Sequence, residues 1–275
     1  MSVLDEIIVG VKEDLQARQI LTPLDEIISR AMRVSPALDV TKHFSAGKFG
    51  VIAEVKRSSP SKGALAAITD PAALAKSYEA GGACAVSVLT ETRRFNGSLA
   101  DLAAVRAAVS IPVLRKEFIV DEYQIFEARA YGADIILLIV AALTDSELSQ
   151  FSQLTRTLGM RTLIEVHNQE ELDRVIRLSN ANSLAVDLLG INARNLKTLE
   201  INTEIFARLA PQISAGITVI AESGIGSPDE VAALAAVGAD GILVGEALVK
   251  DGDPATAIDV FLHRAQGARV RRLSS

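Results

Sequence analysis

Charged and hydroxyl side chains end an apolar run near the start of the chain, in Gly50-Val51-Ile52-Ala53-Glu54-Val55-Lys56-Arg57-Ser58-Ser59-Pro60-Ser61. Because alternate residues of a β-strand share a face, Ile52, Glu54 and Lys56 are expected to point to the same side. If other elements cover that side, both charges are buried, and buried charges are costly unless they are paired. A buried lysine–glutamate pair can donate and accept protons. The alternative is an edge strand with a solvated pair of charges.

Polar residues end several later apolar runs in the same way. Lys116 follows Leu114 by two positions, and Glu165 follows Leu163 by two positions. Two more runs end in Gly190-Ile191-Asn192-Ala193-Arg194-Asn195 and in Ala221-Glu222-Ser223-Gly224. Two lysines and two glutamates that met in one cavity could hold a proton donor and a proton acceptor at neutral pH. A structural cluster of salt bridges is the alternative.

Other nucleophiles and metal-ligand types are sparse. His167 comes directly after the run that contains Glu165, and we expect its side chain to point away from the cavity. The single cysteine, Cys84, stands between small and apolar residues, which favours a core position over a nucleophile. The three histidines are scattered along the chain, so no metal site is predicted.

The polar residues need elements that bring strand ends together, and strands and helices alternate regularly from residue 50 onward. Apolar strand candidates lie at 51–56, 85–90, 112–116, 134–140, 161–166, 184–191, 217–222 and 241–244. Segments with helical periodicity lie between them, for example at 71–80, 99–109, 121–131 and 145–158. Gly82, Gly132 and Gly238 precede three of the strands, where a glycine ends a helix in the left-handed conformation.

Eight strands that alternate with helices predict an all-parallel sheet covered by helices. A closed (β/α)8 TIM barrel uses every strand, and barrels of this type carry their sites at the carboxyl ends of the strands. A doubly wound open sheet is the rival fold. It would favour a glycine-rich turn after the first strand, whereas this chain has Lys56-Arg57-Ser58-Ser59-Pro60 there. We therefore predict an α/β protein with a TIM-barrel fold.

Two amphipathic helices are predicted before the first strand. The first spans residues 2–20 and has one apolar stripe. The second begins with Thr22 as N-cap and Pro23 as its first residue, and a loop at 35–48 follows it. This N-terminal helical extension, residues 1–48, either packs as a structural or dimerisation element or covers a site. We expect one domain over residues 1–275, with the barrel at 49–265 and a polar tail at 266–275.

Composition limits the possible partners. The chain has 275 residues, of which 49% are hydrophobic and only 4% aromatic, so an aliphatic core is expected. Its net charge of -6 argues against nucleic acid or an anionic membrane as a partner. The start lacks the pattern of a signal peptide, and the longest apolar run, 135–143, is too short to span a bilayer. We expect a cytoplasmic monomer that acts on a small molecule.

The last two strand ends have the pattern of a phosphate site. Ser223-Gly224-Ile225-Gly226 forms a turn rich in backbone donors, and residues 227–230 have the spacing of a capping box at a helix start. Gly245 and Glu246 open a short helical piece after the last strand. Because the loops after the last two strands of a barrel commonly hold a phosphate, we predict a phosphorylated ligand. Glu246 would then contribute its backbone N–H.

In combination, these motifs resemble the indole-3-glycerol phosphate synthase family. The stretches that carry the resemblance lie at 52–61, 87–91, 95–98, 112–120, 137–140, 165–167, 190–196, 221–225 and 243–246. They extend over residues 1 to about 262. The segment 178–187 departs from the family pattern, because it is longer and has no glycine, and Ala193 replaces a common asparagine.

The resemblance implies a lyase of tryptophan biosynthesis that needs neither a cofactor nor a metal. Its substrate would be 1-(2-carboxyphenylamino)-1-deoxyribulose 5-phosphate, and its products indole-3-glycerol phosphate, carbon dioxide and water. The ring closes by condensation, which needs an acid at the ribulose carbonyl. The final dehydration needs an acid and a base, so the lysines and glutamates suit both steps.

The resemblance also implies a role for each matching residue. Lys116 would be the principal general acid with Glu165 as its partner, and Lys56 a second cationic acid paired with Glu54. Asn192 and Arg194 would hold the substrate carboxylate, and Ser223 would lie between the phosphate and the reacting carbons. The phosphate end would be lined by Ser59, Gly224, Gly245 and Glu246. The apolar walls around the anthranilate ring would be Pro60, Phe95, Phe118, Leu196 and Leu243.

Three other readings of the residues stay open. A phosphoribosyl-anthranilate isomerase would rely on a cysteine and aspartate pair at strand ends, whereas Cys84 precedes its strand. A Schiff-base aldolase is compatible with lysines at two strand ends. A barrel that binds a sugar phosphate and regulates a partner would show binding without turnover.

Overall fold

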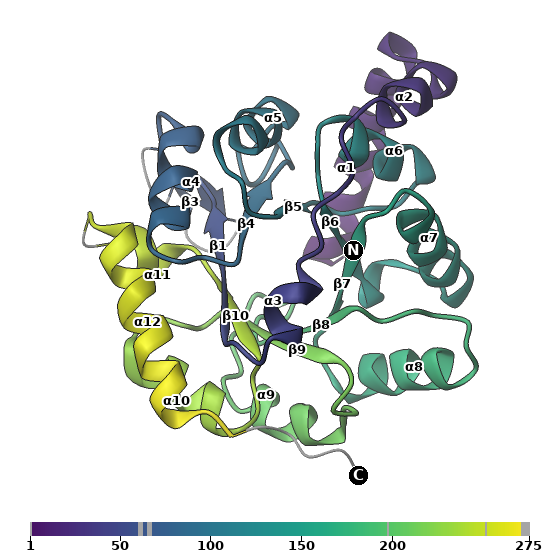
Figure 1. Cartoon of the computed structure of the whole chain (residues 1–275). Coiled ribbons are helices and arrows are strands. Elements are labelled where there is room, and N and C mark those ends of the chain that lie inside the picture. Colours follow the sequence, from purple (N-terminus) through teal and green to yellow (C-terminus); the bar gives the residue numbers. More distant parts are fainter. Residues whose placement is uncertain (1, 60–62, 65–67, 197, 251, 271–275) are drawn as a thin grey trace.

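The computed structural model describes residues 2–59, 63–64, 68–196, 198–250 and 252–270. Eight parallel strands form a closed barrel in the order β1-β10-β9-β8-β7-β6-β5-β4, and helices lie around its outside (Figure 1). The barrel strands are β1 Gly50–Val55, β4 Ala85–Leu89, β5 Val113–Lys116, β6 Ile135–Ile139, β7 Arg161–Val166, β8 Leu188–Asn192, β9 Thr218–Glu222 and β10 Gly241–Val244. Because β1 pairs with both β10 and β4, the TIM barrel is confirmed and the open sheet is excluded.

Each barrel strand is followed by helical structure before the next strand begins. The α-helices are α4 Pro71–Ala80, α5 Leu99–Ala108, α6 Glu122–Ala130, α7 Asp145–Thr157, α8 Gln169–Asn180, α9 Ile205–Leu209, α10 Pro228–Ala236, α11 Glu246–Val249 and α12 Pro254–Ala268. Short 3-10 helices lie at η1 Val140–Ala142 and η2 Ala210–Gln212, and a small hairpin pairs β2 Ser58–Ser59 with β3 Gly63–Ala64. The helix α12 continues past residue 265, where the polar tail was expected to begin. Gly82, Gly132 and Gly238 have the predicted left-handed conformation.

The predicted sixth strand began too early. The strand β8 starts at Leu188, four residues after the expected start at 184, because residues 184–187 are engaged by side chains. The carbonyl of Ala185 accepts from the Ser152 hydroxyl at 3.1 Å. The carboxylate of Asp187 accepts a hydrogen bond from the backbone N–H of Thr162 at 3.4 Å. In a paired strand, a backbone carbonyl would accept from this N–H instead.

Two sets of apolar side chains fill the barrel and its surroundings. Residues on the outward faces of the strands pack against the helices in the larger cluster, which includes Val51, Val86 and Ile164. Residues on the inward faces form a second cluster, which includes Ile52, Leu114, Leu163 and Ile220. This division follows from the alternation of side chains along a strand.

The N-terminal extension contacts both ends of the barrel. It comprises α1 Val3–Leu21, α2 Leu24–Ala31 and the short α3 Thr41–Ser45, of which α3 was not predicted. The expected N-cap Thr22 instead ends α1, where its N–H donates to the Arg18 carbonyl, and α2 begins after Pro23. Leu4, Ile7 and Val11 of α1 pack with residues from the barrel interior, and α2 lies beside α6 (Figure 1).

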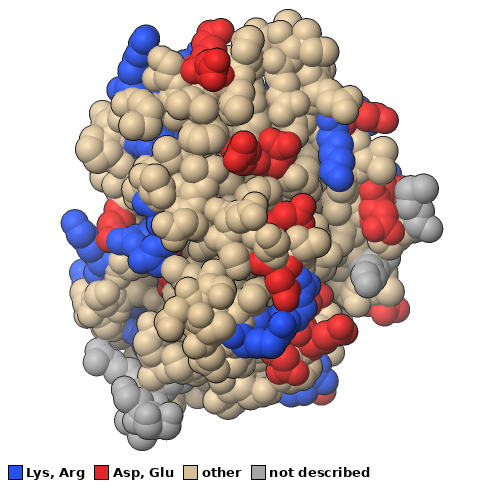
Figure 2. Space-filling view, turned by 90° about the vertical axis from the view of Figure 1, so that its right-hand side faces the viewer, with Lys and Arg blue, Asp and Glu red and all other residues tan. Residues whose placement is uncertain are grey.

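Charged side chains of both signs are interspersed over the face of the molecule that Figure 2 shows. The helices α7 and α8 lie on this side of the barrel. They carry ion pairs such as Arg174 with Asp145 at 2.9 Å and Arg156 with Asp187 at 3.4 Å. Among the described helices, none combines the length and the apolar composition that a membrane span requires.

Asp39 anchors the extension to the start of β7. Its carboxylate accepts from Arg161 at 2.7 and 3.1 Å and from the hydroxyl and N–H of Thr41. The hydrogen bond from Arg161 lowers the pKa of Asp39 from 3.8 to about 2, against the opposing effect of burial. Because this pKa lies below its unfolded value, the ionised carboxylate stabilises the fold above about pH 4. That contribution disappears as the pH falls towards 2.

Asp39→Asn is therefore expected to lower the free energy of unfolding by about 1 kcal/mol near neutral pH, a modest value because the pair is partly solvated. The difference from wild type should shrink as the pH falls from about 5 towards 2. Urea denaturation across this range measures it, with the exposed α12 variant Asp259→Asn as control. A deficit that stayed constant with pH would show that Asp39 acts through packing and not through its charge.

Candidate active site

A charged layer closes the carboxyl end of the barrel interior. Its members come from alternate strands: Glu54 of β1, Lys116 of β5, Glu165 of β7 and Glu222 of β9. Each follows by two positions a buried aliphatic residue of the layer below: Ile52, Leu114, Leu163 and Ile220. Alternate strands of such barrels supply the four side chains of one interior layer. Here the fold brings one lysine and three glutamates from four different strands into one layer.

Lys116 lies at the centre of this layer. Its Nζ is 2.7 Å from Glu222 Oε2, 3.5 Å from Glu165 Oε2 and 3.9 Å from Glu54 Oε2. Burial alone would lower the pKa of Lys116, but the three carboxylates outweigh burial and raise it. Lys116 therefore keeps its positive charge, and its carboxylate neighbours replace the solvation that burial removes.

Lys56 lies at the edge of the layer. Its Nζ is 2.6 Å from Glu54 Oε1, and its side chain is 22% exposed, whereas that of Lys116 is 12% exposed. Burial would raise the pKa of Glu54, but Lys56 and Lys116 hold it below its usual value. The pair that the sequence predicted on one strand face is present, with Glu54 ionised between two lysines.

Glu165 and Glu222 differ in their protonation. Burial raises the pKa of Glu222 to about 8, because Lys116 offsets only part of the burial while the charge of Glu165 adds to it. The pKa of Glu165 is lowered, since Lys116 and His167 outweigh burial there. Near neutral pH, the site thus places one protonated carboxyl beside an ammonium group and ionised carboxylates. This difference between the pKa values of two neighbouring carboxyl groups allows one to act as an acid and the other as a base.

Gly190 of β8 makes room for the Glu222 carboxylate. A Cβ atom at residue 190 would collide with Glu222 Oε1 and would also lie 3.1 Å from Glu222 Cδ. The side chain of Glu222 is only 1% exposed, so it has little space into which to move. Residue 190 is glycine because the Glu222 side chain lies so close to it, and not because its backbone conformation is unusual.

Gly190→Ala is expected to displace Glu222 from Lys116, lowering kcat about tenfold or more and destabilising the fold by about 1–3 kcal/mol through overpacking. Steady-state kinetics and urea denaturation measure the two effects. Gly216→Ala serves as control, because a Cβ there meets no atom within 4 Å. Equal activity in both variants would mean that the position of Glu222 does not matter.

The charged layer forms the floor of a cavity of about 830 Å³. The predicted site residues that line it are Glu54, Lys56, Phe95, Lys116, Phe118, Glu165, Asn192, Arg194, Leu196, Ser223, Gly224, Leu243, Gly245 and Glu246. Pro60 and the side chain of Ser59 lie outside the described residues. The cavity also contains residues that were not predicted, among them Glu222 of β9 and Leu4 and Ile7 of α1.

Two phenylalanines form part of the apolar wall. The rings of Phe95 and Phe118 are tilted by 40° with centroids 6.1 Å apart. The loop that carries Phe95 is organised by Glu91, whose carboxylate accepts from the backbone N–H of Arg93, Arg94 and Phe95 at 3.0, 2.7 and 3.0 Å. The two arginines in turn pair with acidic residues of α1, Glu6, Glu13 and Asp14. Ion pairs thus hold this loop against the N-terminal helix.

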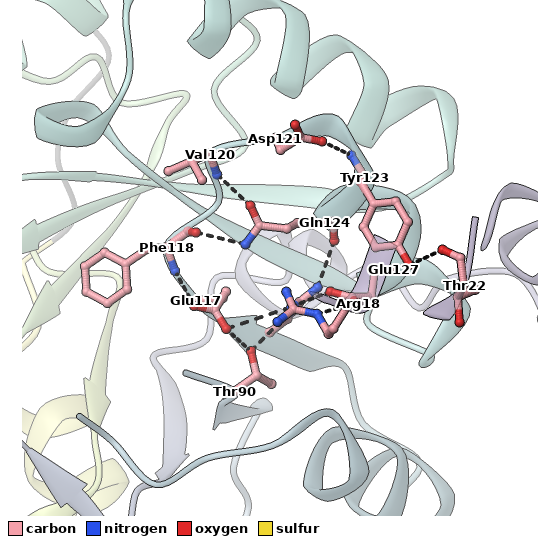
Figure 3. A network of polar contacts seen from close by, with 11 residues as sticks. Arg18, Thr22, Thr90, Glu117, Phe118, Val120, Asp121, Tyr123, Gln124 and Glu127 are labelled. Carbon is pink, nitrogen blue, oxygen red and sulfur yellow. Dashed lines mark hydrogen bonds and ion pairs between the residues drawn. The ribbon is translucent and has the colours of Figure 1, made fainter. Parts of the chain in front are cut away.

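A buried polar network fixes the backbone of Phe118 (Figure 3). Its N–H donates to Glu117 at 3.0 Å, and its carbonyl accepts from Gln124 at 3.0 Å. The network continues through Thr90 to Arg115, whose guanidinium donates to Glu127 at 2.9 Å. Arg18 of α1 donates to the same carboxylate at 2.8 Å. The strand end that carries Lys116 and Phe118 is therefore linked to the N-terminal helix.

The opposite set of loops offers polar groups to the cavity. Asn192 Oδ1 accepts from the N–H of Arg194 at 2.9 Å, and the Arg194 guanidinium donates to the Leu199 carbonyl at 3.1 Å. Ser223 and Gly224 both have positive φ, of 65° and 72°, which turns the chain sharply after β9. The predicted capping box of Ser227 and Glu230 is present at the start of α10. Gly245 precedes α11, as predicted.

Two site residues were missed or misplaced by the sequence analysis. Glu222 follows Ile220 by two positions, so the alternation that selected Lys116 and Glu165 also indicates it. His167 was expected to turn outward, and this was wrong, although it is not among the residues that line the main cavity. Its side chain is 4% exposed, and Nε2 lies 3.0 Å from Glu165 Oε1, because the alternation continues one residue beyond the end of β7.

The geometry disfavours the rival enzyme classes. Cys84 lies at the amino end of β4 with its Sγ 3.3 Å from the Val51 carbonyl, and burial raises its pKa to about 12. It is a core residue, as predicted. A Schiff-base lysine must lose its proton before it attacks a carbonyl, whereas the carboxylates around Lys116 hold that proton.

Known proteins resemble this chain over nearly its whole length. The family model described as indole-3-glycerol phosphate synthase matches residues 4–261. A protein named indole-3-glycerol phosphate synthase from Nocardioides sp. is 55% identical over 258 residues, which cover 94% of this chain and 97% of that protein. Indole-3-glycerol phosphate synthase 1 of Streptomyces coelicolor is 54% identical over 271 residues, 98% of both chains. The protein of that name from Mycolicibacterium gilvum is 54% identical over 257 residues, 94% of this chain and 92% of its own length.

A solved structure shows the same fold at low sequence similarity. Thiamine phosphate pyrophosphorylase from Pyrococcus furiosus has a TM-score of 0.59 and 14% sequence identity, covering 80% of this chain and 96% of its own. At this identity the likeness concerns the barrel alone. The long matches at more than half identity carry the assignment, and they confirm the resemblance seen in the motifs: the chain belongs to the indole-3-glycerol phosphate synthase family.

Proposed function

We propose that the protein converts 1-(2-carboxyphenylamino)-1-deoxyribulose 5-phosphate to indole-3-glycerol phosphate, carbon dioxide and water by general acid–base catalysis. One observation carries the proposal: the Lys116 ammonium lies among the carboxyl groups of three glutamates on the floor of a cavity with aromatic and aliphatic walls. Family membership supports the same reaction. The enzyme would act as a carbon–carbon carboxy-lyase.

In the first step, a ring carbon of the anthranilate attacks the ribulose carbonyl. Lys116 is proposed as the principal general acid, because an ammonium group that is protonated in the resting site can give a proton to the oxygen as negative charge develops on it. Glu165 is its carboxylate partner. Glu222, with a pKa of about 8, is proposed to restore the proton that Lys116 gives away.

After carbon dioxide leaves, the ring must lose water. Lys56 is proposed as the second cationic acid and Glu54 as its partner in proton transfer, since their side chains meet at 2.6 Å. Ser223 is proposed to lie between the phosphate and the reacting carbons. The more exposed position of Lys56 suits contact with the sugar portion of the substrate, which extends from the cavity floor towards the phosphate end.

The walls of the cavity are proposed to bind three parts of the substrate. Asn192 and Arg194 would hold the carboxylate, Arg194 through its fork of donors. The anthranilate ring would pack against Pro60, Phe95, Phe118, Leu196 and Leu243, with Leu4 and Ile7 of α1 adding to this wall. The phosphate would bind near Ser59 and the backbone N–H groups of Gly224, Gly245 and Glu246.

We further propose that residues 1–275 act as one domain and as a monomer, because a single chain supplies both the extension residues and the barrel residues that line the cavity. A phosphorylated biosynthetic intermediate is made and used inside cells, which supports a cytoplasmic location. The extension is proposed to cover the site as well as to pack, since Leu4 and Ile7 border the cavity and Arg18 joins the network behind Phe118.

The test is to mix the purified protein with the carboxyphenylamino-deoxyribulose phosphate in buffer that contains a chelator. Indole fluorescence is expected to rise, and it is easily seen because the chain has no tryptophan. Extraction of the product and detection of carbon dioxide identify the reaction. Binding of the substrate without any rise would return the protein to the class of non-catalytic sugar-phosphate binders.

A further inference from the structure

The proposed reaction consumes one proton in every turnover, and the inference drawn here rests on that function. The substrate enters with an ionised carboxylate, which leaves as neutral carbon dioxide while its bonding electrons remain in the ring. The oxygen that leaves as water takes up two protons, one during condensation and one during dehydration. One proton returns when the carbon beside the nitrogen loses its hydrogen. The balance is one proton, which solvent must supply to the charged layer.

The charged layer is poorly connected to solvent. The side chains of Glu165 and Glu222 are 2% and 1% exposed, and that of Lys116 is 12% exposed. A bound substrate would lie over this floor and restrict access through the mouth of the cavity. A second connection between the layer and solvent would allow the proton to be replaced without passing the ligand.

His167 lies on such a connection. Its Nε2 is 3.0 Å from Glu165 Oε1, and its Nδ1 is 3.0 Å from Glu171 Oε2. Exposure of the side chains increases outward along this row, from 2% for Glu165 through 4% for His167 to 12% for Glu171. An imidazole can receive a proton on one nitrogen and release another from the second. Because the ring nitrogen that has lost its proton must be loaded again, and because Nε2 makes no aligned hydrogen bond in this structure, movement of the ring is part of any transfer along this row.

A small side cavity of about 100 Å³ adjoins this row. It is lined by His167, Asn168 and Glu171 together with Leu4, Ala141, Asn195 and Leu196. At about 30 Å³ for each molecule, it has room for roughly three waters. The charged groups that face His167 are Glu165 from β7 and Glu171 from α8, whereas the other residues that line the side cavity are uncharged.

We propose that Glu171 and His167 form a proton path that carries one proton per turnover from the side cavity to Glu165, and from there to Lys116 and Glu222. His167 gives its Nε2 proton to Glu165 and keeps the proton on Nδ1. The neutral ring then turns, so that the bare Nε2 takes up a proton that water of the side cavity delivers through Glu171, and it turns back, which returns each group to its initial state. In agreement, the two carboxylates outweigh burial and raise the pKa of His167 to about 10, which keeps the ring protonated. His167 acts on the substrate only through Glu165.

The test compares His167→Gln and Glu171→Gln with wild type in single-turnover and steady-state fluorescence assays. Both variants keep side chains of similar polarity but cannot pass a proton through the row. The first turnover should proceed at nearly the wild-type rate, because it uses the proton already stored in the charged layer. Steady-state kcat should fall about tenfold or more with little change in KM, and added imidazole should restore it. His263→Gln, on the exposed surface of α12, is the matched control.

Each outcome has one meaning for the path. Loss of the first turnover together with steady-state activity, without rescue by imidazole, would show that His167 only positions Glu165, and it would overturn the proposal. Unchanged steady-state activity would overturn it as well. If His167→Gln fails to fold, as judged by circular dichroism, Glu171→Gln decides in its place. An inactive wild-type enzyme would instead refute the proposed function, which keeps the two failures apart.

Discussion

Lys116→Ala is expected to lower kcat by about 10²–10⁴-fold while the substrate still binds. The ammonium is the only cation that contacts Glu54, Glu165 and Glu222 together among the described residues. Its removal takes away the acid that would protonate the ribulose carbonyl, a contribution made mainly in the transition state. It also leaves the carboxylates without their shared counter-charge, so their pKa values should rise.

The indole fluorescence assay gives kcat and KM for this variant, and a titration that follows the substrate under non-turnover conditions gives its affinity. Lys42→Ala, on the exposed surface of α3 at the other end of the barrel, controls for loss of a lysine in general. Circular dichroism establishes that both variants are folded. An unchanged kcat would sink the assignment of Lys116 as the principal acid, and a large rise in KM alone would make it a binding residue.

Glu222→Gln is expected to lower kcat by about 10²–10³-fold with a well-folded protein. Glutamine has the shape of the protonated carboxyl, which is the form that a pKa of about 8 favours near neutral pH. It therefore fits the space that Gly190 leaves open, but it cannot release a proton to Lys116 or take one back. The variant separates proton transfer from packing.

The pH profile provides a second readout for Glu222. The raised pKa means that the carboxyl holds its proton below about pH 8 and loses it above, so wild-type kcat should decline on the alkaline side. Because Glu165 and Glu222 interact, this limb reports the pair and not one residue. Glu222→Gln should lose the limb, whereas Glu170→Gln on the exposed surface of α8 should keep it. If Glu222→Gln showed the same decline of kcat at alkaline pH as the wild type, that decline would belong to another group.

Much of the fold was predictable because local signals encode local structure. Alternating or continuous apolar runs predicted the barrel strands, and seven of the eight observed strands begin within about two residues of their predicted starts. The helix α4 begins after Asp70, which caps it, and has Pro71 as its first residue, so its start can be recognised from two neighbouring residue types. The predicted start of β8 was wrong because hydrogen bonds from the Ser152 hydroxyl to the Ala185 carbonyl and from the Thr162 N–H to the Asp187 carboxylate replace strand pairing there. Those partners are distant in the sequence.

The candidate site was partly predictable for the same reason. Side-chain alternation placed Glu54, Lys116 and Glu165 on the inward face, and the same rule would have added Glu222. It was applied wrongly to His167, because alternation was assumed to stop where the strand ends. Leu4 and Ile7 of the first helix gave no local sign that they border the cavity, since an apolar stripe packs equally well against any surface.

The sequence by itself determined the order of the barrel strands and of the helices between them, the starts of helices such as α4 and α10, the glycine turns and the face on which the inward residues within the strands lie. These features depend on backbone preferences and on residues within a few positions of one another. Only the tertiary structure decided that Lys116 contacts Glu222, 106 positions away, that Gly190 leaves room for that carboxylate, and that His167 joins Glu165 to Glu171. Protonation was decided there too, because pKa values depend on burial and on distances between charges that different strands and helices bring together.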